Sequence, residues 1–527
     1  MNRKTGTLLA AILGSSIVFL DSTVVNVALQ RIGQDLPSGR FGVLEGESYV
    51  YNAYLLSLSA LLILAGALAD AYGRRRLFVI GMVGFGVSSV LCGLAPSMEI
   101  LIVFRIVQGG AGALLVPGSL ALLTNTFEGP ERGRAFGLWA AASAATVILG
   151  PVVGGMLVET VGWRAVFFLN VPLIAIALWA TWRYVQESRD PDAARSFDWL
   201  GAVVVGLAVG GLSFGAIYGQ QHQWHDGVGQ VAVAVGAVAA VLFGILMAVR
   251  PNPLVPLGLF RSRNFSVTNL STFLIYGALY VSGYQQSIFS QGTLQYSAAA
   301  AGFIGVPGAL LLVIFSSRAG AMSARLGPRR FMAVGPALMA AGILWLARLP
   351  SSSPAWNLQP GDPASWLPSS GYLVDFLPST IIFGLGLAIT VAPLTSALMA
   401  SVPENRAGLG SAVNNAISRV GPQLAGALIF VALTGAFYAD LSSRAPGIDT
   451  SSEQLRAQIA PLNRPDPAAA PALVLAANES STDAFHLAMG LSAGLLLAGA
   501  VVNAIGIRDP ERAGATVAAT AAVAAGE

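Results

Sequence analysis

Long apolar runs separated by short polar loops recur along the whole chain of 527 residues. A helix needs about 20 consecutive apolar residues to cross the hydrocarbon core of a bilayer. Fourteen such runs can be read from the sequence, which predicts an all-α polytopic membrane protein. The predicted spans are 7–29, 48–69, 77–95, 99–126, 134–158, 164–182, 198–219, 229–249, 266–290, 299–322, 330–348, 371–397, 407–436 and 484–506.

The composition supports this class, because 55% of the residues are hydrophobic and only 10% are charged, against roughly 25% charged in soluble domains. The glycine content, 60 residues, allows close approach of membrane helices. The single cysteine, Cys92, excludes an intrachain disulfide and a cysteine metal cluster. We predict no metal site. The net charge of +3 does not indicate a nucleic-acid partner, because the arginines lie in short clusters between apolar runs.

The basic clusters predict topology. Lys and Arg favour cytoplasmic loops, and the basic loops 70–76, 250–265 and 323–329 place both termini in the cytoplasm. Arg3 and Lys4 resemble the start of a signal peptide, but no cleavage site follows them, so we expect a retained first span. The predicted protein is therefore a multi-pass protein of the inner, cytoplasmic membrane, with an external loop at 437–483 and a cytoplasmic tail at 509–527.

Internal repeats divide the chain into two halves. The segment GALADAYGRRR (66–76) returns as GAMSARLGPRR (320–330), with identity at five of eleven positions. A second pair is ERGRAFG with GPVVGG in the first half and ENRAGLG with GPQLAG in the second. Parallel repeats of this kind occur in transporters with a central site between the halves. We predict an N-terminal bundle (1–195), two inserted helices (196–250) at the periphery, and a C-terminal bundle (251–508).

Charged residues inside spans are the candidate functional groups. Asp21, in FLDSTVVNVAL, is the only acid well inside a predicted span, and a charge at the bilayer centre costs at least about 2.5–3.5 kcal/mol. Such an acid faces a cavity or a partner, or it snorkels outward from a span end. Arg105 lies in RIVQGGAGA, with Gln108 three residues on along the same helix face. A structural pairing of Arg105 with a carbonyl group is the alternative to a functional role.

Other candidates have ordinary explanations. Arg318 and Arg419 are expected to snorkel or to pair with neighbouring helices. His222, His225 and Asp226 are expected to form an external turn. Several aromatic residues could line a cavity, although core packing is the default reading: Tyr54, Tyr276, Tyr280, Tyr284, Phe289 and Trp139.

Taken together, these motifs resemble the Major Facilitator Superfamily and, within it, the fourteen-span drug:proton antiporter family. LDSTVVNVAL resembles the first-span signature of that family, GALADAYGRRR its span 2–3 loop, RIVQGGAGA its fourth span and GPVVGG its fifth-span antiporter motif. NPLVPLGLFRSRNF resembles its recurrent linker. The resemblance covers essentially the whole chain and implies the major facilitator fold, with two six-helix bundles and two additional transmembrane helices between them.

The resemblance also implies roles for individual residues. Asp70, with Gly66, Gly73 and Arg74, is expected to form a cytoplasmic gate in which Asp70 contacts the start of the thirteenth span near Ala407. Two positions depart from the family pattern, because Ala71 stands where arginine is frequent and Ala324 replaces the aspartate of the second copy. Any gate is therefore expected to be asymmetric.

The antiporter motif comprises Gly150, Pro151, Gly154 and Gly155. Glycines remove bulk and proline removes one helical hydrogen bond. We therefore expect a thin, kinked helix that packs closely at the interface between the halves. The resemblance makes this motif the best sequence evidence for export rather than import.

The function predicted from these features is proton-coupled export of amphipathic drugs or antibiotics by alternating access. Asp21 and Arg105 are the expected proton-coupling pair, and Asn26 and Gln108 are the candidate substrate contacts. The expected partners are small amphipathic substrates, protons and membrane lipids, with a periplasmic adaptor left open. No nucleotide-binding or catalytic motif is found, so we expect no enzyme activity and no cofactor, the energy coming from the proton gradient.

Two other functions remain open at the level of the sequence. The first is export of lipids or lipid-linked metabolites on the same fold, with the inserted helices opening a lateral portal. The second is a membrane sensor or scaffold without transport, which would be expected to carry a soluble signalling domain. The largest predicted non-membrane segment is the external loop 437–483.

Overall fold

In the computed structural model every regular element of the described residues is a helix. The described residues are 2–37, 43–189, 197–221, 227–359, 362–450, 452, 455, 459–463 and 470–509. The predicted tail at 509–527 lies outside this set except for Asp509, and the cluster of His222, His225 and Asp226 lies wholly outside it.

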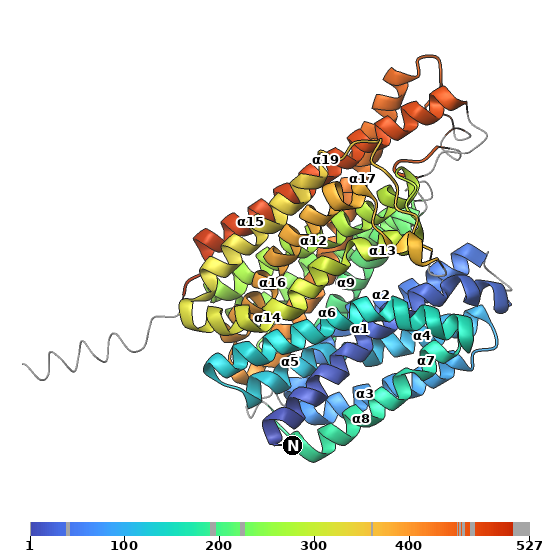
Figure 1. Cartoon of the computed structure of the whole chain (residues 1–527). Coiled ribbons are helices and arrows are strands. Elements are labelled where there is room, and N and C mark those ends of the chain that lie inside the picture. The colour runs from blue at the N-terminus through green and yellow to red at the C-terminus, as the bar shows by residue number, and fades with distance from the viewer. Residues whose placement is uncertain are drawn as a thin grey trace, which may run out of the picture.

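Eight helices form the N-terminal half, coloured blue to cyan-green in Figure 1. Side chains cap several helix starts, such as the Asn2 oxygen that accepts from the Thr5 N–H at 2.8 Å. The helices are α1 (Arg3–Asp35), α2 (Val43–Tyr72), α3 (Arg74–Gly93), α4 (Met98–Ala113), α5 (Leu115–Thr126), α6 (Gly129–Thr160), α7 (Ala165–Phe168) and α8 (Asn170–Tyr184).

The middle of the chain contributes a pair of long helices and one short one, and the C-terminal half contributes the rest. The middle elements are α9 (Trp199–Gln221), α10 (Val228–Val249) and α11 (Gly258–Arg261). The C-terminal helices are α12 (Arg263–Gly292), α13 (Ala298–Ile304), α14 (Val306–Leu326), α15 (Pro328–Leu346), α16 (Leu377–Ala400), α17 (Ala407–Arg444) and α19 (Pro471–Gly506), with short turns η1 (Pro363–Trp366), η2 (Tyr372–Phe376) and η3 (Glu404–Arg406).

Among the described residues, 12 helices are long and apolar enough to cross a membrane. They account for all the predicted spans except 134–158 and 266–290, which fall on α6 and α12. The helix α12 carries many polar residues, including Thr268, Asn269 and Thr272, which lowers its hydropathy although it is 30 residues long. The predicted fold class, an all-α polytopic membrane protein, is confirmed.

The two copies of the repeated loop adopt the same local structure. Gly73 and Gly327 both have positive φ, at 112° and 90°, a conformation that favours glycine. A carboxylate then caps the following helix in each copy: Glu187 accepts from the Arg75 and Arg76 N–H groups, and Asp509 accepts from the Arg329 N–H, all at 3.0 Å. The sequence repeat is thus a structural repeat.

The two halves meet at the end of the bundle that contains the turn at Gly73, here called the Gly73 end. Helix α2 packs against α17, and α6 packs against α14. Glycines permit the second contact, since a Cβ added to Gly133 would lie 2.7 Å from the Gly320 carbonyl oxygen. One hydrophobic core runs across both halves here and joins Leu398, Ala407 and Leu409 to the N-terminal helices. The clusters that extend toward the opposite end each belong to one half.

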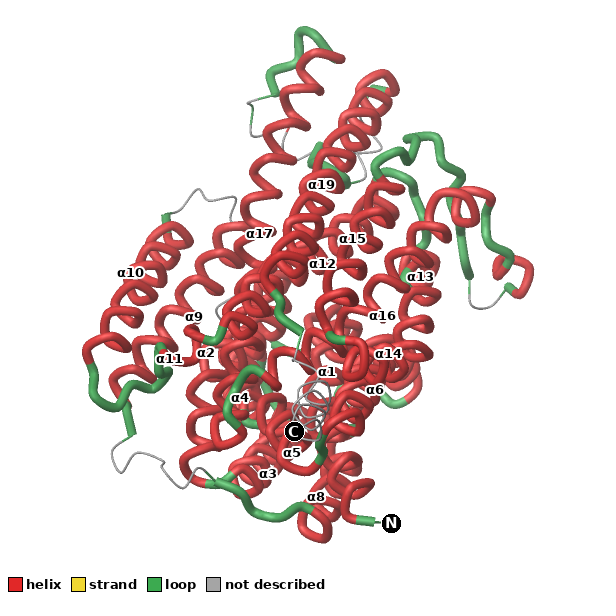
Figure 2. The backbone as a smooth tube through the Cα atoms, turned by 90° about the vertical axis from the view of Figure 1, so that its left-hand side faces the viewer, coloured by secondary structure: helices red, strands yellow, loops and turns green. Residues whose placement is uncertain are grey.

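The inserted helices lie beside this assembly. Helix α9 packs against α2 and α17, whereas α10 packs chiefly on α9, and Figure 2 shows α10 at the edge of the bundle. Only 17% of the most apolar stretch of α10 is buried inside the molecule. Asp198, at the start of α9, pairs with Arg250 after α10 at 2.5 Å and so ties the two ends of the pair together.

Candidate functional site

The acid of the first span is enclosed by the N-terminal helices. Asp21, on α1, is 1% exposed, and Arg105, on α4, is fully buried. Arg105 Nη1 pairs with Asp21 Oδ2. Because both groups are removed from solvent, each requires the other: removing one partner of a buried pair costs about 3–5 kcal/mol.

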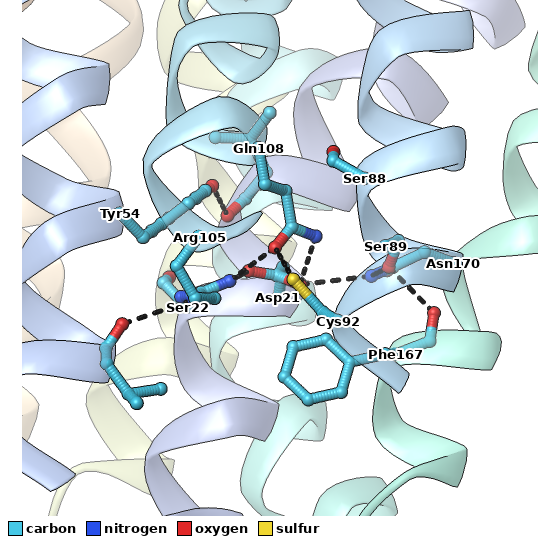
Figure 3. Close-up of polar contacts among 12 residues, drawn as sticks. Asp21, Ser22, Tyr54, Ser88, Ser89, Cys92, Arg105, Gln108, Phe167 and Asn170 are labelled. Atoms are coloured by element: carbon cyan, nitrogen blue, oxygen red, sulfur yellow. Dashed lines mark hydrogen bonds and ion pairs between the residues drawn. The ribbon is translucent and has the colours of Figure 1, made fainter. Parts of the chain in front are cut away.

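Two amides complete the shell around Asp21 (Figure 3). Gln108 Nε2 and Asn170 Nδ2 each donate to Asp21 Oδ1 at 3.0 Å. Gln108 also accepts from Arg105 Nη1 at 2.7 Å. Asn170, on α8, donates to Ser89 Oγ at 2.9 Å, and Ser89 donates to the Phe167 carbonyl at 2.8 Å. All the side-chain contacts seen at Asp21 therefore come from donors, and the site fits the ionised carboxylate.

The guanidinium of Arg105 has further contacts. Its Nε donates to the Val50 carbonyl at 3.2 Å, and the group lies 4.1 Å from the ring centroid of Tyr54, a cation–π distance. The Tyr54 hydroxyl donates to the Val18 carbonyl at 2.9 Å. Arg105 Nη2 is buried without a partner. The expected functional partner and the alternative carbonyl partner of Arg105 are thus both present.

Among the predicted site residues, the structure brings together Asp21, Arg105 and Gln108 but not Asn26. Asn26 lies on an exposed part of α1. Asn170 and Ser89 are not predicted from the sequence, and Tyr54 is predicted only as one of several aromatic residues that could line a cavity. A search for amides inside apolar runs would have found Asn170, in FFLNVPLIAI, because a buried amide requires polar partners.

The residues predicted to form a gate lie at the Gly73 end, where the halves meet. Asp70 accepts from the Gly408 and Leu409 N–H groups at 3.1 and 2.7 Å, and from Arg74 Nε at 2.9 Å. Its position is the one that the family resemblance implies, at the start of α17. No side chain of its own caps α17, so Asp70 supplies the N-terminal cap from the other half of the molecule.

Neighbouring residues reinforce this contact. Arg74 Nη2 donates to the Glu404 carbonyl at 2.5 Å, and Arg132 pairs with the Glu404 carboxylate at 2.8 Å. A Cβ on Gly66 would lie 2.6 Å from the Gly408 carbonyl oxygen, so Gly66 allows α2 and α17 to touch. The corresponding position in the second copy, Ala324, carries no charge and cannot cap a helix in this way.

The antiporter motif occupies a different place from the one expected. A Cβ on Gly154 would lie 3.1 Å from Val24 Cα, and one on Gly150 would overlap Thr23. These glycines therefore pack α6 against α1 inside the N-terminal half. The prediction that Gly150 and Gly154 lie at the interface between the two halves is wrong. Gly155 has a looser contact, 4.0 Å from Val27, and the side chain of Pro151 lies outside the described set. The α6 glycines that meet α14 are Gly133 and Gly137, since a Cβ on each would lie 2.7 Å from the Gly320 carbonyl oxygen and 2.5 Å from Ser317 Cα, respectively.

Comparisons with known proteins define the class of the molecule. The family model of the Major Facilitator Superfamily matches residues 11–426, and the chain belongs to this superfamily. It is a multi-pass membrane transporter and not an enzyme, and the family prediction is confirmed.

The chain is similar to curated proteins with resistance names. It is 32% identical over 431 residues to the multidrug resistance protein Stp of Mycobacterium tuberculosis, covering 81% of this chain and 76% of that protein. It is 32% identical over 436 residues to the tetracenomycin C resistance and export protein of Streptomyces glaucescens, with the same coverage of 81% and 76%. It is therefore related to drug and antibiotic resistance exporters.

A solved structure supports the fold. The human organic anion transporter MFSD10 superposes with a TM-score of 0.58 at 13% identity, covering 95% of this chain and 99% of that one. This likeness bears on the fold alone.

The shell around Asp21 yields a first prediction. Asn170→Ala removes a donor to Asp21 and leaves Ser89 with one partner fewer, so we expect the free energy of unfolding to fall by about 1–3 kcal/mol. Thermal unfolding of the purified protein in detergent measures this. Asn415→Ala is the matched control, because among the described residues the Asn415 amide bonds to Ser411 alone, one turn back on α17. If both variants lost the same free energy of unfolding, the Asn170 amide would stabilise the protein no more than an amide bonded within its own helix, and the prediction would be wrong.

A second prediction concerns the contact at the Gly73 end. Asp70→Asn removes the charge that caps α17 and pairs with Arg74, so we expect the two halves to separate there more often. In an Ala412→Cys background, where residue 412 is buried against α2, a water-soluble maleimide should then react several-fold faster. Arg76→Gln is the control, because Arg76 is exposed and lies outside this contact. An unchanged labelling rate would show that Asp70 does not hold the halves together.

Proposed function

We propose that this transporter exports amphipathic drugs or antibiotics in exchange for protons, by alternating access. The observation that carries the proposal is the buried Asp21–Arg105 pair with its two amide donors. The resistance names of the relatives support the substrate class. The expected energy source is the proton gradient, and the expected location is the cytoplasmic membrane.

The site suggests how a proton drives the cycle. Every side-chain contact seen at Asp21 donates to its carboxylate, so a protonated Asp21 would present its own O–H to groups that also donate. Protonation would also leave Arg105 buried without a counter-charge, which is costly. Proton uptake therefore disfavours the arrangement of α1 and α4 seen here, and this preference couples the proton to a change of conformation.

The proposed orientation places the Gly73 end in the cytoplasm, together with both termini, because the basic clusters gather there. The contacts of Asp70 with α17 then close the cytoplasmic side, and the present structure is the outward-facing state. In this proposal Asp70, Arg74, Gly66 and Gly73 form a cytoplasmic gate that must open in the inward-facing state.

The proposed organisation is an N-terminal bundle (1–195), the inserted pair (196–250), a C-terminal bundle (251–508) and a cytoplasmic tail (509–527). The exposure of α10 supports a peripheral place for the pair. Gln108 is assigned to the coupling network rather than to substrate, because Asp21 and Arg105 occupy its amide. Asn26, on the exposed part of α1, remains the proposed substrate contact.

The test of coupling uses Asp21→Asn in proteoliposomes with an imposed pH gradient and a dye that the wild type transports. Without a titratable group at position 21, uphill efflux should be lost, whereas downhill exchange should survive. Asp21→Glu should keep part of the activity with a shifted pH dependence, because the carboxylate is displaced by one methylene.

Asp198→Asn is the matched control, since Asp198 is also a buried, ion-paired acid but lies at the start of α9. It should retain uphill efflux. If Asp21→Asn pumps a neutral substrate uphill at the wild-type rate, coupling lies elsewhere and the proposal fails. A parallel assay of lipid translocation decides between drug export and lipid export.

A further inference from the structure

The face of α17 that meets the N-terminal half continues beyond their contact. Gly408 and Ala412 touch Gly66 of α2 at the Gly73 end. Because an α-helix repeats every 3.6 residues, Arg419 and Gln423 follow on that same face, about two and three turns after Ala412. Arg419 lies twelve residues into α17 (407 to 419), about 18 Å from its start at 1.5 Å per residue.

Arg419 differs from the other arginines inside the bundle. Arg105 and Arg74 are buried and each pairs with a carboxylate. Arg419 is only half-buried, and no ion pair or hydrogen bond joins its side chain to a described residue. The helix pairing expected from the sequence is therefore not seen. Since a cation within a bilayer is costly without a partner, this guanidinium has an unmet requirement for an anion.

A second polar group is unpartnered one turn further on. The Oε1 atom of Gln423 is buried and has no hydrogen-bond partner. Residues four apart on a helix are neighbours on its surface, so Arg419 and Gln423 can serve one ligand. The amide of Gln423 offers either an acceptor or, after rotation about its terminal torsion, a donor.

Aromatic side chains lie near this position on helices of both halves. On α12, a Cβ on Gly277 would lie 3.1 Å from the Ala425 side chain of α17, which brings Tyr276 and Tyr280 beside this stretch of α17. On α2, which runs antiparallel to α17 from the contact at Gly66, Tyr54 lies twelve residues from Gly66 (54 to 66), about as far as Arg419 lies from Gly408 (408 to 419), and Tyr51 lies one turn further on. The rings of Tyr276 and Tyr280 lie 6.3 Å apart, and Tyr280 is 56% exposed. Tyr54 also contacts Arg105, so this position lies next to the coupling pair. The charge of Arg105 is already balanced by Asp21.

From these observations we infer that Arg419, assisted by Gln423, binds the anionic group of an amphipathic substrate whose aromatic or apolar body rests on Tyr51, Tyr276 and Tyr280. This inference rests on the proposed function as an exporter and narrows its substrate class. The ligand chemistry is a negatively charged group, such as a carboxylate, sulfonate or phosphate, attached to an apolar body. A soluble drug and an anionic lipid both carry that chemistry.

The test compares two dyes that share a xanthene ring system and differ in charge, the anion fluorescein and the cation rhodamine 6G. Equilibrium binding is measured on the full chain purified in detergent, with protein-free micelles as the blank. The wild type should bind fluorescein more tightly. Arg419→Gln should weaken fluorescein binding about 10-fold or more, because a charged hydrogen bond is lost, and should leave rhodamine 6G binding unchanged or stronger. Arg419→Lys should retain most of the preference.

Arg318→Gln is the matched control, because Arg318 is an exposed arginine on α14 of the same half. It should leave the binding of both dyes unchanged. Thermal unfolding checks that each variant is folded. Unchanged fluorescein binding in Arg419→Gln, or equal losses for both dyes, would overturn the inference.

Competition then distinguishes the two sources of the anion. If phosphatidylglycerol displaces fluorescein and phosphatidylcholine does not, the natural occupant is an anionic lipid; if neither displaces it, the occupant is a soluble amphiphile. These binding measurements need no gradient. A failure of Asp21-dependent efflux therefore overturns the proposed function and leaves the anion site standing, whereas unchanged fluorescein binding in Arg419→Gln, with intact efflux, overturns only the anion site.

Discussion

The cost of placing charge in an apolar medium governs this structure. A carboxylate and a guanidinium lie in the interior of the N-terminal half, and neither can remain there alone. Their mutual pairing links α1 to α4 through the two side chains, and Asn170 of α8, which also donates to Ser89 of α3, extends the link to α8 and α3. The site is therefore a structural element of the half-bundle and, in the proposed function, the group that responds to a proton.

The second constraint is the need to join two halves in a way that can be reversed. Without a hydrophobic drive between helices in lipid, association depends on close packing and polar contacts. At the Gly73 end, glycines of α2, α6 and α14 allow backbones to touch, and the Asp70 carboxylate caps α17 from the opposite half. Capping bonds to backbone N–H groups are directional, so a modest displacement of α17 would break them together.

The two charged sites lie at different depths and are connected through α2. Tyr54 contacts the Arg105 guanidinium from one position on α2, and Asp70 lies in the last turn of the same helix, at the proposed gate. A rearrangement around Asp21 that moved α2 would therefore act directly on the contact with α17. Arg419 adds a third charge on α17, facing the same helix from the other half. Substrate, proton and gate would then share α2 as their common element.

The sequence by itself determined the membrane class, the two-fold repeat, the family and the identity of the buried acid, because these depend on local hydropathy, on motifs and on the high cost of a charge inside a span. Tertiary structure decided the partners. The sequence could place Arg105 and Gln108 on one helix face, but it could not show that Asn170 reaches Asp21 from α8, 149 residues away. It also misplaced Gly150 and Gly154, since a small-residue face does not specify which neighbour it meets. The environment of Arg419 was likewise beyond the sequence, because the face that a helix turns toward the other half depends on how the two bundles pack.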